Sequence, residues 1–356
     1  MTDPARAAAA GRRLTPVIRL APAKLNLTLA VLGRRPDGFH DLHSVMVPLA
    51  LADRLSVARA ATAGDSLHVE GLDAGPVLEN LVLRAIALAR EAIGRSADGF
   101  PLAARLEKRI PVAAGLAGGS SDAAAAIDAA LEAWALLDPD GPPDPEVAAL
   151  RAAVAARVGA DVPFFQAGGP ALVEGRGERV TPLRPIRGAA PGILLVTPAV
   201  AASTPAVFAA FDAGGRASPA DPRSTRLSSE HLATELRAGL DAASLVARAG
   251  VLASANDLAP AAASVVDGLT ALRRALTRRL GRAVGVSGSG PTLWVLYPSA
   301  AAADAAADEV RRGIADGSLV APGQAPPSII ATSFAGPAPI ESRNKRNETT
   351  GHTTEG

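Results

Sequence analysis

Apolar and polar positions along the chain follow two periods, which together predict a mixed fold of strands and helices. Residues 17–32 alternate at period two, with leucines on one face and polar side chains on the other. This segment is expected to form a strand pair or one long strand. Residues 79–93 instead carry apolar side chains at helical spacing, and Asn80 sits near their start.

The rest of the chain continues this mixture. Alternation or short apolar runs predict strands over residues 42–57 (broken at Pro48 and Asp53), 102–110, 193–198 and 328–334, a hairpin over 172–180, and two strands around a loop over 283–296. Helical spacing predicts helices over residues 146–158, 229–280 with an interruption at 255–258, and 300–314. Ser203-Thr204-Pro205 is expected to open a helix, whereas residues 212–228 are polar and loop-like.

Residues 184–192, rich in Pro and Gly, are the best candidate domain boundary. We therefore expect a flexible leader over residues 1–16, a first domain over 17–188, a second domain over 189–337 and a disordered tail over 338–356. Residues 192–211 are uncharged over the length of a membrane span. Their prolines and hydroxyl side chains favour a buried strand followed by a short helix.

Composition narrows the function classes. The chain has 356 residues, is 48% hydrophobic and carries a formal net charge of +1, so neither a nucleic-acid partner nor a membrane surface is indicated. It has no cysteine, which excludes disulfides and thiolate metal sites and fits a cytoplasmic location. Its five histidines have no zinc-enzyme spacing.

The glycine-rich stretch at residues 111–126 is the strongest candidate for chemistry. Gly115, Gly118 and Gly119 form a loop with almost no side chain, and an alanine run that favours helix follows it. Residues 120–122, Ser-Ser-Asp, are expected to cap that helix. Such a loop leaves unpaired N–H groups at the positive end of a helix dipole, which favours phosphate. The spacing fits neither a P-loop nor a dinucleotide fingerprint, and an ordinary turn before an alanine helix is the alternative.

Two charged residues could act near such a phosphate. Lys24 shares the polar face of its strand with Asn26 and Thr28, which a solvent-facing polar row on an edge strand would also explain. Lysine is scarce in this arginine-rich chain, so a retained Lys24 hints at a specific need for an ammonium group. Asp161 lies between a helix end and an apolar strand. It is either a turn residue or, beside a phosphate, a candidate general base.

Two further loops suggest ligand contact. Phe39 and His40 follow a Pro-Asp-Gly turn, and could stack on a planar ligand or plug a hairpin. Residues 285–290, Gly-Val-Ser-Gly-Ser-Gly, have no sizeable side chain, so a backbone segment or a ligand is expected to pass close to them.

Three motifs stand in a fixed order: Ala-Pro-Ala-Lys-Leu-Asn-Leu at residues 21–27, the glycine loop at 111–121, and the second glycine loop at 285–290. In this order they closely resemble the GHMP kinase superfamily, whose phosphate loop has no Walker lysine. The stretches Pro-Asp-Gly-Phe-His-Asp-Leu-His at 36–43 and Gly-Ala-Asp-Val-Pro-Phe-Phe at 159–165 resemble the branch that acts on a cytidylyl-linked methylerythritol.

The resemblance covers about residues 17–335 and implies a two-domain α+β kinase fold with its active site in the interdomain cleft. It implies phosphorylation of the substrate's 2-hydroxyl by ATP with Mg²⁺, in the non-mevalonate isoprenoid pathway, by a monomer or homodimer. Asp161 matches the catalytic aspartate, which orients the hydroxyl and accepts its proton late. Lys24 matches the lysine that pairs with it and steadies the alkoxide.

The resemblance also implies binding residues. For ATP these are Asn80, Pro111, Val112, Ala113, Ala114, Gly115, Leu116, Ala117, Gly118, Gly119, Ser120 and Ser121, with Ser120 or Ser121 near Mg²⁺. For the substrate they are Asn26, Phe39, His40, Thr204, Phe208, Gly288, Ser289 and Gly290. Phe39 and Phe208 would sandwich the cytosine, and His40 would hydrogen-bond its edge.

Two positions depart from the superfamily pattern. Phe39 replaces a frequent Tyr, which keeps stacking but loses a hydroxyl contact. Ala117 replaces a frequent Gly, which we expect to be tolerable only at negative φ. Two other functions compete with this reading. A kinase for homoserine or mevalonate would share the loops but not need the aromatic pair, and a nucleotide-binding regulatory protein would not need Lys24 or Asp161.

Overall fold

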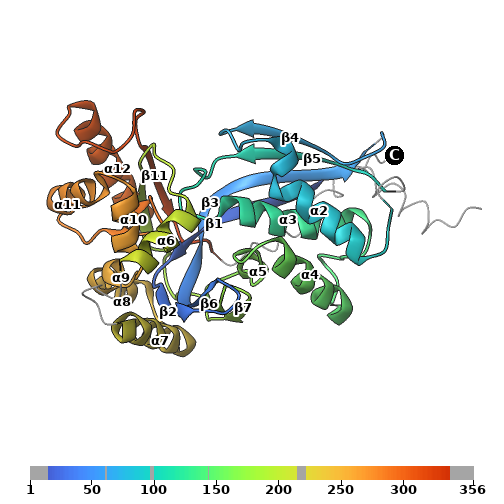
Figure 1. The fold of residues 1–356 in the computed structure, drawn as a ribbon, viewed down its shortest axis with the longest axis horizontal. Coiled ribbons are helices and arrows are strands. Elements are labelled where there is room, and N and C mark those ends of the chain that lie inside the picture. The colour runs from blue at the N-terminus through green and yellow to red at the C-terminus, as the bar shows by residue number, and fades with distance from the viewer. Residues whose placement is uncertain (1–14, 61, 97–99, 143, 215–221, 337–356) are drawn as a thin grey trace, which may run out of the picture.

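The computed structural model describes residues 15–60, 62–96, 100–142, 144–214 and 222–336, which are arranged around two β-sheets (Figure 1). The larger sheet has seven strands: β4-β5-β3-β6-β7 form a row, and β1 and β2 each pair with β3. The strands are β1 (Val17–Asn26), β2 (Ala30–Arg34), β3 (His40–Arg59), β4 (Ser66–Gly71), β5 (Leu102–Lys108), β6 (Ala171–Gly175) and β7 (Arg179–Pro182). The alternating segment at 17–32 is therefore two strands that share a neighbour. The expected leader up to residue 14 and the tail from residue 338 lie outside the described residues.

The long strand β3 corrects one expectation, because it runs through both Pro48 and Asp53 without a break. Pro48 lies opposite Lys24, beside a β-bulge between Pro22 and Lys24, where the ladder is already irregular. The Asp53 carboxylate is buried, but it accepts hydrogen bonds from the backbone N–H groups of Arg109 and Ile110. Neither residue therefore interrupts the strand.

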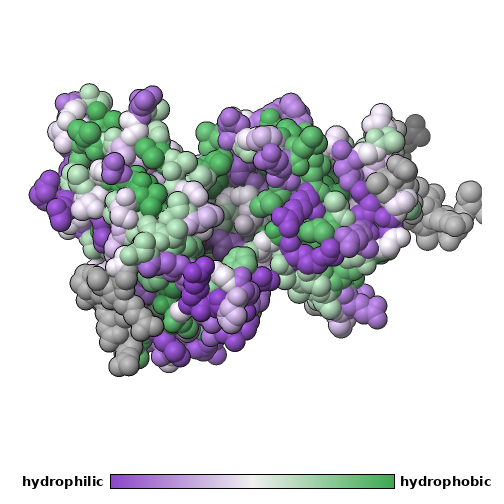
Figure 2. Space-filling view, in the orientation of Figure 1, coloured by the Kyte–Doolittle hydropathy of each residue, from purple (hydrophilic) through white to green (hydrophobic). Residues whose placement is uncertain are grey.

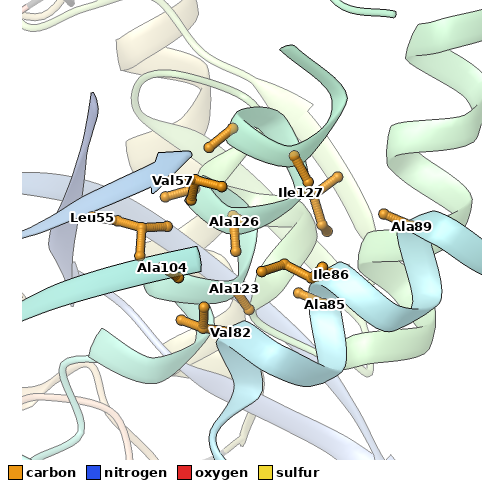
Figure 3. Packing of buried hydrophobic residues seen from close by; sticks show 14 of the residues in the cluster. Leu55, Val57, Val82, Ala85, Ile86, Ala89, Ala104, Ala123, Ala126 and Ile127 are labelled. Carbon is orange, nitrogen blue, oxygen red and sulfur yellow. The ribbon is translucent and has the colours of Figure 1, made fainter. Parts of the chain in front are cut away.

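Helices cover one face of this sheet. They are α2 (Leu81–Ala92), α3 (Gly118–Ala133), α4 (Pro145–Val158) and the short α5 (Val162–Phe165), preceded by the 3-10 turn η1 (Val77–Glu79). Figure 3 shows Leu55 and Val57 of β3 facing Ala126 and Ile127 of α3. Alanine has no side chain beyond Cβ, so α3 lies close to both α2 and the sheet. Asn80, predicted only to lie near the helix start, is the N-cap of α2, with its Oδ1 accepting from the Val82 N–H at 3.0 Å.

The smaller sheet is antiparallel, in the order β11-β8-β10-β9. Its strands are β8 (Gly192–Thr197), β9 (Gly285–Val286), β10 (Leu293–Tyr297) and β11 (Ser328–Ser333). The helices in this part of the chain are α6 (Thr204–Ala213), α7 (Pro222–Ala238), α8 (Ala242–Ala247), α9 (Ala249–Ser254), α10 (Ala259–Val265), α11 (Leu269–Leu280) and α12 (Ala300–Ala315). Of these, α12 packs on the smaller sheet, whereas α7 contacts β2 and β3 of the larger one.

Two expectations about this second part have clear outcomes. The uncharged residues 192–211 form β8 and the beginning of α6, as predicted, and no helix in the described ranges has the length and apolar character needed to cross a membrane. The prediction of a polar loop over 212–228 is wrong in part, because α7 already begins at Pro222. The apolar side of α7, with Leu232 and Leu236 buried, holds this otherwise polar segment as a helix.

One hydrophobic cluster joins the two sheets: Leu25 and Leu27 pack in the same cluster as Leu195 and Trp294. Backbone hydrogen bonds reinforce this junction, since the Leu29 N–H donates to the Ala255 carbonyl and the Asp257 N–H donates to the Leu29 carbonyl. The catalytic candidates of β1 therefore lie where the two parts of the chain meet.

Candidate active site

A cavity of about 520 Å³ lies at this junction, and Figure 2 shows the surface hollowed between the two parts of the molecule. Residues from both parts line it. Among the predicted site residues, those lining the cavity are Lys24, Asn26, Asn80, Pro111, Val112, Ala113, Ala114, Gly115, Ala117, Gly118, Gly119, Ser120, Asp161, Thr204, Phe208, Gly288 and Ser289. The predicted residues outside its lining are Phe39, His40, Leu116, Ser121 and Gly290. The cavity thus gathers most of the predicted residues from segments far apart in the sequence.

The charged pair at the centre of the cavity is Lys24 and Asp161. Lys24 Nζ lies 3.9 Å from Asp161 Oδ2. Lys24 is buried at 4% exposure, whereas the Asp161 side chain is 34% exposed and can meet a ligand. Asp161 is followed by the helix α5 rather than by the expected strand, because the apolar run Val162–Phe165 makes one helical turn. The β-bulge just before Lys24 was not predicted, because the alternation recognised in the sequence, Leu25, Leu27 and Leu29, begins only after it.

Burial lowers the pKa of Lys24, and the Asp161 carboxylate opposes that shift only in part. An ammonium in this position is therefore poorly solvated. The ammonium donates a short hydrogen bond to Asn26, whose Oδ1 lies 2.6 Å from Lys24 Nζ. Such a cation would gain from a developing negative charge nearby, because few other groups neutralise it.

The polar row on β1 is buried, so the alternative of a solvent-facing row on an edge strand is wrong. Asn26 Nδ2 donates to Ser44 Oγ at 2.8 Å, and Ser44 Oγ donates to the Thr28 carbonyl at 2.6 Å. Asn26 and Thr28 are 3% and 0% exposed. This chain of hydrogen bonds fixes the Asn26 amide, and through it the position of the Lys24 ammonium.

The glycine loop at 111–121 differs in detail from what its sequence predicts. The helix α3 begins at Gly118, with Ala117 as its N-cap, so residues 120–122 lie inside the helix and do not cap it. Ala113 and Ala117 have φ of 52° and 53°. The expectation of a negative φ at Ala117 is therefore wrong, and the loop holds a left-handed alanine at a cost of about 1–2 kcal/mol. A helix start without a side-chain cap leaves its N–H groups for a ligand.

The second glycine loop lies against the first. A Cβ on Gly115 would come within 2.3 Å of the Ser287 carbonyl oxygen, and Gly115 has φ of +77°. The close passage expected at residues 285–290 is thus the backbone of the glycine loop at 111–121. On the other side, Gly288 lies beside Lys24: a Cβ there would be 3.2 Å from Nζ. Thr204 Oγ1 lies 3.0 Å from Ser289 Oγ, which ties α6 to this loop.

The aromatic residues form a different arrangement from the predicted sandwich. His40 stacks directly on Phe208, with ring centroids 4.7 Å apart and planes inclined by 20°. Its Nε2 lies 2.8 Å from Asp212 Oδ1, so that nitrogen already has a partner. Phe39 is 52% exposed, and the guanidinium of Arg176 lies over its ring. Phe208 lines the cavity, whereas Phe39 and His40 do not.

A buried charged triad of Lys108, Asp53 and Asp122 lies beside the glycine loop at 111–121 and was not predicted from the sequence. Lys108 Nζ donates to Asp53 Oδ2 at 2.5 Å and to Asp122 Oδ2 at 2.8 Å. Asp122 Oδ1 is buried without a hydrogen-bond partner among the described residues. Lys108 and Asp122 both line the cavity. The scarcity of lysine was the one feature of the sequence that could have indicated Lys108, but it was used only to single out Lys24.

The triad makes stability depend on pH. Burial, only partly opposed by Lys108, raises the pKa of Asp122 to about 7. Between about pH 4 and pH 7 the folded protein keeps a proton that the unfolded chain releases, so the free energy of unfolding falls as pH rises through this window. Asp122→Asn removes the titration. From pH 5 to pH 8, the stability of this variant relative to the parent should rise by about 1–3 kcal/mol, as measured by urea unfolding.

The matched control for this prediction is Asp128→Asn on the same helix. The Asp128 carboxylate pairs with Arg151 near the surface, with Oδ2 2.6 Å from Nη2. That variant should keep the parent's fall in stability with pH, because Asp122 is untouched. If the free energy of unfolding changes equally with pH in the parent and in Asp122→Asn, Asp122 is not the group responsible for the pH dependence.

Comparisons with known proteins agree with this architecture. The family model of the GHMP kinase N-terminal domain matches residues 80–169, and that of the C-terminal domain matches residues 237–316. A 4-diphosphocytidyl-2-C-methyl-D-erythritol kinase from Pelotomaculum thermopropionicum is 38% identical over 297 residues, covering 83% of this chain and 94% of the relative. A crystal structure of a 4-(cytidine 5'-diphospho)-2C-methyl-D-erythritol kinase, 32% identical, superposes with a TM-score of 0.61 over 90% of this chain and 100% of the other.

A homoserine kinase from Cytophaga hutchinsonii has a TM-score of 0.60 at 18% identity, covers 90% of this chain and 95% of its own, and shares the fold alone. The two family models, together with the fold of two sheets, place the chain in the GHMP class of kinases, phosphotransferases that use ATP. Within that class, the chain belongs to the family of the 4-diphosphocytidyl-2-C-methyl-D-erythritol kinases. The fold and family predicted from the sequence motifs are confirmed.

Proposed function

We propose that the protein transfers the γ-phosphoryl group of ATP to the 2-hydroxyl of 4-diphosphocytidyl-2-C-methyl-D-erythritol, in the cytoplasmic non-mevalonate isoprenoid pathway. The observation that carries the chemistry is the Lys24–Asp161 pair, 3.9 Å apart, in the same cavity as the phosphate loop. Family membership carries the choice of substrate. A regulatory protein without activity would have no use for this pair.

In the proposed reaction, the N–H groups at the start of α3 bind the ATP phosphates. The acceptor hydroxyl lies between Asp161 and the γ-phosphorus. As its oxygen bonds to phosphorus, the bond to the ADP oxygen breaks, and the hydroxyl proton passes to the Asp161 carboxylate. The Lys24 ammonium stabilises the negative charge that builds on the attacking oxygen. Positioning and charge neutralisation therefore account for most of the catalysis.

A magnesium ion fits this site as a companion of the nucleotide. Among the described residues, no three His, Asp or Glu side chains gather to hold a metal. Ser120 and Asp161 line the cavity, whereas Ser121 Oγ is buried outside its lining. Mg²⁺ is usually held by one or two protein oxygens together with substrate phosphates, so Ser120 is the better candidate ligand. When bound, the ion neutralises charge on the phosphates.

Phe208 is proposed to stack on the cytosine. It lines the cavity, and its ring already stacks on one planar ring, that of His40. Phe208→Ala should raise KM for the cytidylyl substrate about 10-fold or more, through loss of stacking worth about 1–3 kcal/mol, and leave KM for ATP unchanged. Phe39→Ala is the informative comparison, because Phe39 is half exposed and outside the lining. A second large effect there would require Phe39 to turn inward when substrate binds. If neither variant changes KM for the cytidylyl substrate, the proposal that aromatic rings stack on the cytosine is wrong.

The deciding experiment measures ADP release with Mg·ATP across four acceptors: the cytidylyl compound, the same polyol phosphate without cytidine, homoserine and mevalonate. We expect turnover with the cytidylyl compound alone. Turnover of homoserine or mevalonate instead would keep the roles of Lys24 and Asp161 and overturn the substrate. ATP binding without any turnover would favour the regulatory protein.

A further inference from the structure

Three consecutive carbonyl groups of the phosphate loop are held by residues outside the loop. The Ala114 carbonyl accepts from the Thr292 N–H at 3.4 Å, and the Gly115 carbonyl accepts from Ser287 Oγ at 3.0 Å. The Leu116 carbonyl accepts from the Lys24 N–H at 3.0 Å. Two of these donors belong to the second glycine loop and its flank, and the third is the catalytic lysine's own backbone.

These bonds set the direction of the loop's N–H groups. In a trans peptide the N–H points opposite to the C=O of the same peptide unit. Fixing the carbonyls of residues 114–116 therefore turns the N–H groups of residues 115–117 the other way. Within the described part of the chain, no backbone hydrogen bond is donated by residues 115–120. The N–H groups available to phosphate are thus oriented by the hydrogen bonds that hold the carbonyls on the opposite side of the loop.

Ser287 is the side chain in this arrangement, and it is fully buried. Its carbonyl accepts from the Gly290 N–H at 2.8 Å, and its N–H donates to the Thr292 carbonyl at 2.9 Å. Asn256 holds the neighbouring residues, with Nδ2 donating to the Val286 and Gly288 carbonyls at 2.9 Å each. A Cβ on Gly115 would also meet the Gly290 carbonyl at 3.0 Å, so the two loops have little freedom to move apart independently.

We propose that Ser287 is a positioning residue that couples the two halves of the site. An acceptor that orders Gly288 and Ser289 also orders Ser287, which fixes the Gly115 carbonyl and with it the phosphate-binding N–H groups. ATP and acceptor then bind with positive coupling, and each raises the affinity for the other by the same factor. The proposal rests on the proposed function, because it assigns the acceptor to the second glycine loop.

The test is a binding cycle without turnover. The Kd of a non-hydrolysable ATP analogue with Mg²⁺ is measured by calorimetry with and without saturating cytidylyl-methylerythritol, in the parent and in Ser287→Ala. We expect the acceptor to tighten the analogue about 5-fold or more in the parent, within the usual range of such couplings. In Ser287→Ala the ratio should fall to about 1–2, because the hydroxyl that carries the coupling is gone. A merely structural role would weaken both ligands and leave the ratio intact.

Ser229→Ala is the matched control. Ser229 is also fully buried and also joins the two parts of the chain, through Thr28 Oγ1 at 2.8 Å, but its described side-chain hydrogen bonds go to Thr28 and His43 and not to either glycine loop. It should keep the parent's ratio. Should Ser287→Ala not fold, Ser287→Cys keeps a side chain of the same shape, slightly larger and with a much weaker donor, and should give an intermediate ratio.

Each other outcome contradicts a distinct claim. A parent ratio near 1 with both ligands bound, or an unchanged ratio in Ser287→Ala, overturns the coupling and leaves the proposed function intact. Failure of the parent to bind the cytidylyl compound at all overturns the proposed substrate instead.

Discussion

Asp161→Asn is expected to lower kcat by about 10²–10⁴-fold, because the amide cannot accept the proton of the acceptor hydroxyl. ATP should still bind, since the phosphate contacts come from the loop and from the start of α3. The fold should also survive. The Asp161 side chain makes no capping hydrogen bond to α5, and its one described ion pair is the 3.9 Å contact with Lys24.

The measurement is steady-state ADP release, with nucleotide binding and the midpoint of thermal unfolding as controls. Asp122→Asn is a useful partner variant, because it removes a carboxylate from the same cavity but at the triad beneath the loop. It should keep most of the turnover. Unchanged turnover in Asp161→Asn would exclude that carboxylate from the reaction.

Lys24→Met should have a loss of similar size, about 10²–10³-fold in kcat, because methionine fills the buried site without a charge to stabilise the alkoxide. Lys24→Arg should not restore activity. The lysine is 4% exposed, Asn26 Oδ1 lies 2.6 Å from Nζ, and a Cβ on Gly288 would lie only 3.2 Å from Nζ, so a larger planar guanidinium does not fit without displacing its neighbours. Full activity in the arginine variant would show that any cation suffices.

The pH profile offers an independent check on Lys24. Only the protonated amine carries charge, and that form is lost as pH rises through the pKa of Lys24, which burial lowers from 10.5. The fall in kcat/KM on the alkaline side, which reports the free enzyme, should therefore begin below the pH at which a solvated lysine titrates. This limb should be absent from the residual activity of Lys24→Met. An identical alkaline limb in both proteins would assign it to another group.

Much of the fold was accessible from the sequence, because local patterns and the tertiary structure agree. The helix at 79–93, the helix ending at Gly159 and the hairpin at 172–180 all form close to their expected bounds. The exceptions have tertiary causes. In the sequence, Asp53 suggests a strand break, but in the fold Lys108 and two backbone N–H groups satisfy its carboxylate. The helix α7 is stabilised by contacts with distant strands.

The site was predictable where one short segment carries the chemistry. The glycine loop precedes an alanine helix, Lys24 is a rare lysine, and Asp161 lies between a helix end and an apolar run, so each could be recognised from its neighbouring residues. The β-bulge that sets Lys24, the triad around Lys108, and Asn256 could not be found this way. Each depends on groups that are close only in the folded chain, such as Asn256 and the Gly288 carbonyl.

The junction between the two sheets has a consequence for biosynthesis. The Val31 N–H donates to Asp257 across 226 residues, and the Leu51 N–H donates to Thr332 across 281 residues. Strands β2 and β3 therefore obtain these partners only after the ribosome has added the 226 and 281 residues that separate them. Contacts of such long range also form late, because closing a large loop precedes any gain from them. Helices α2 to α5 can pack on their sheet before these partners are made, whereas the cavity between the two sheets is completed only afterwards.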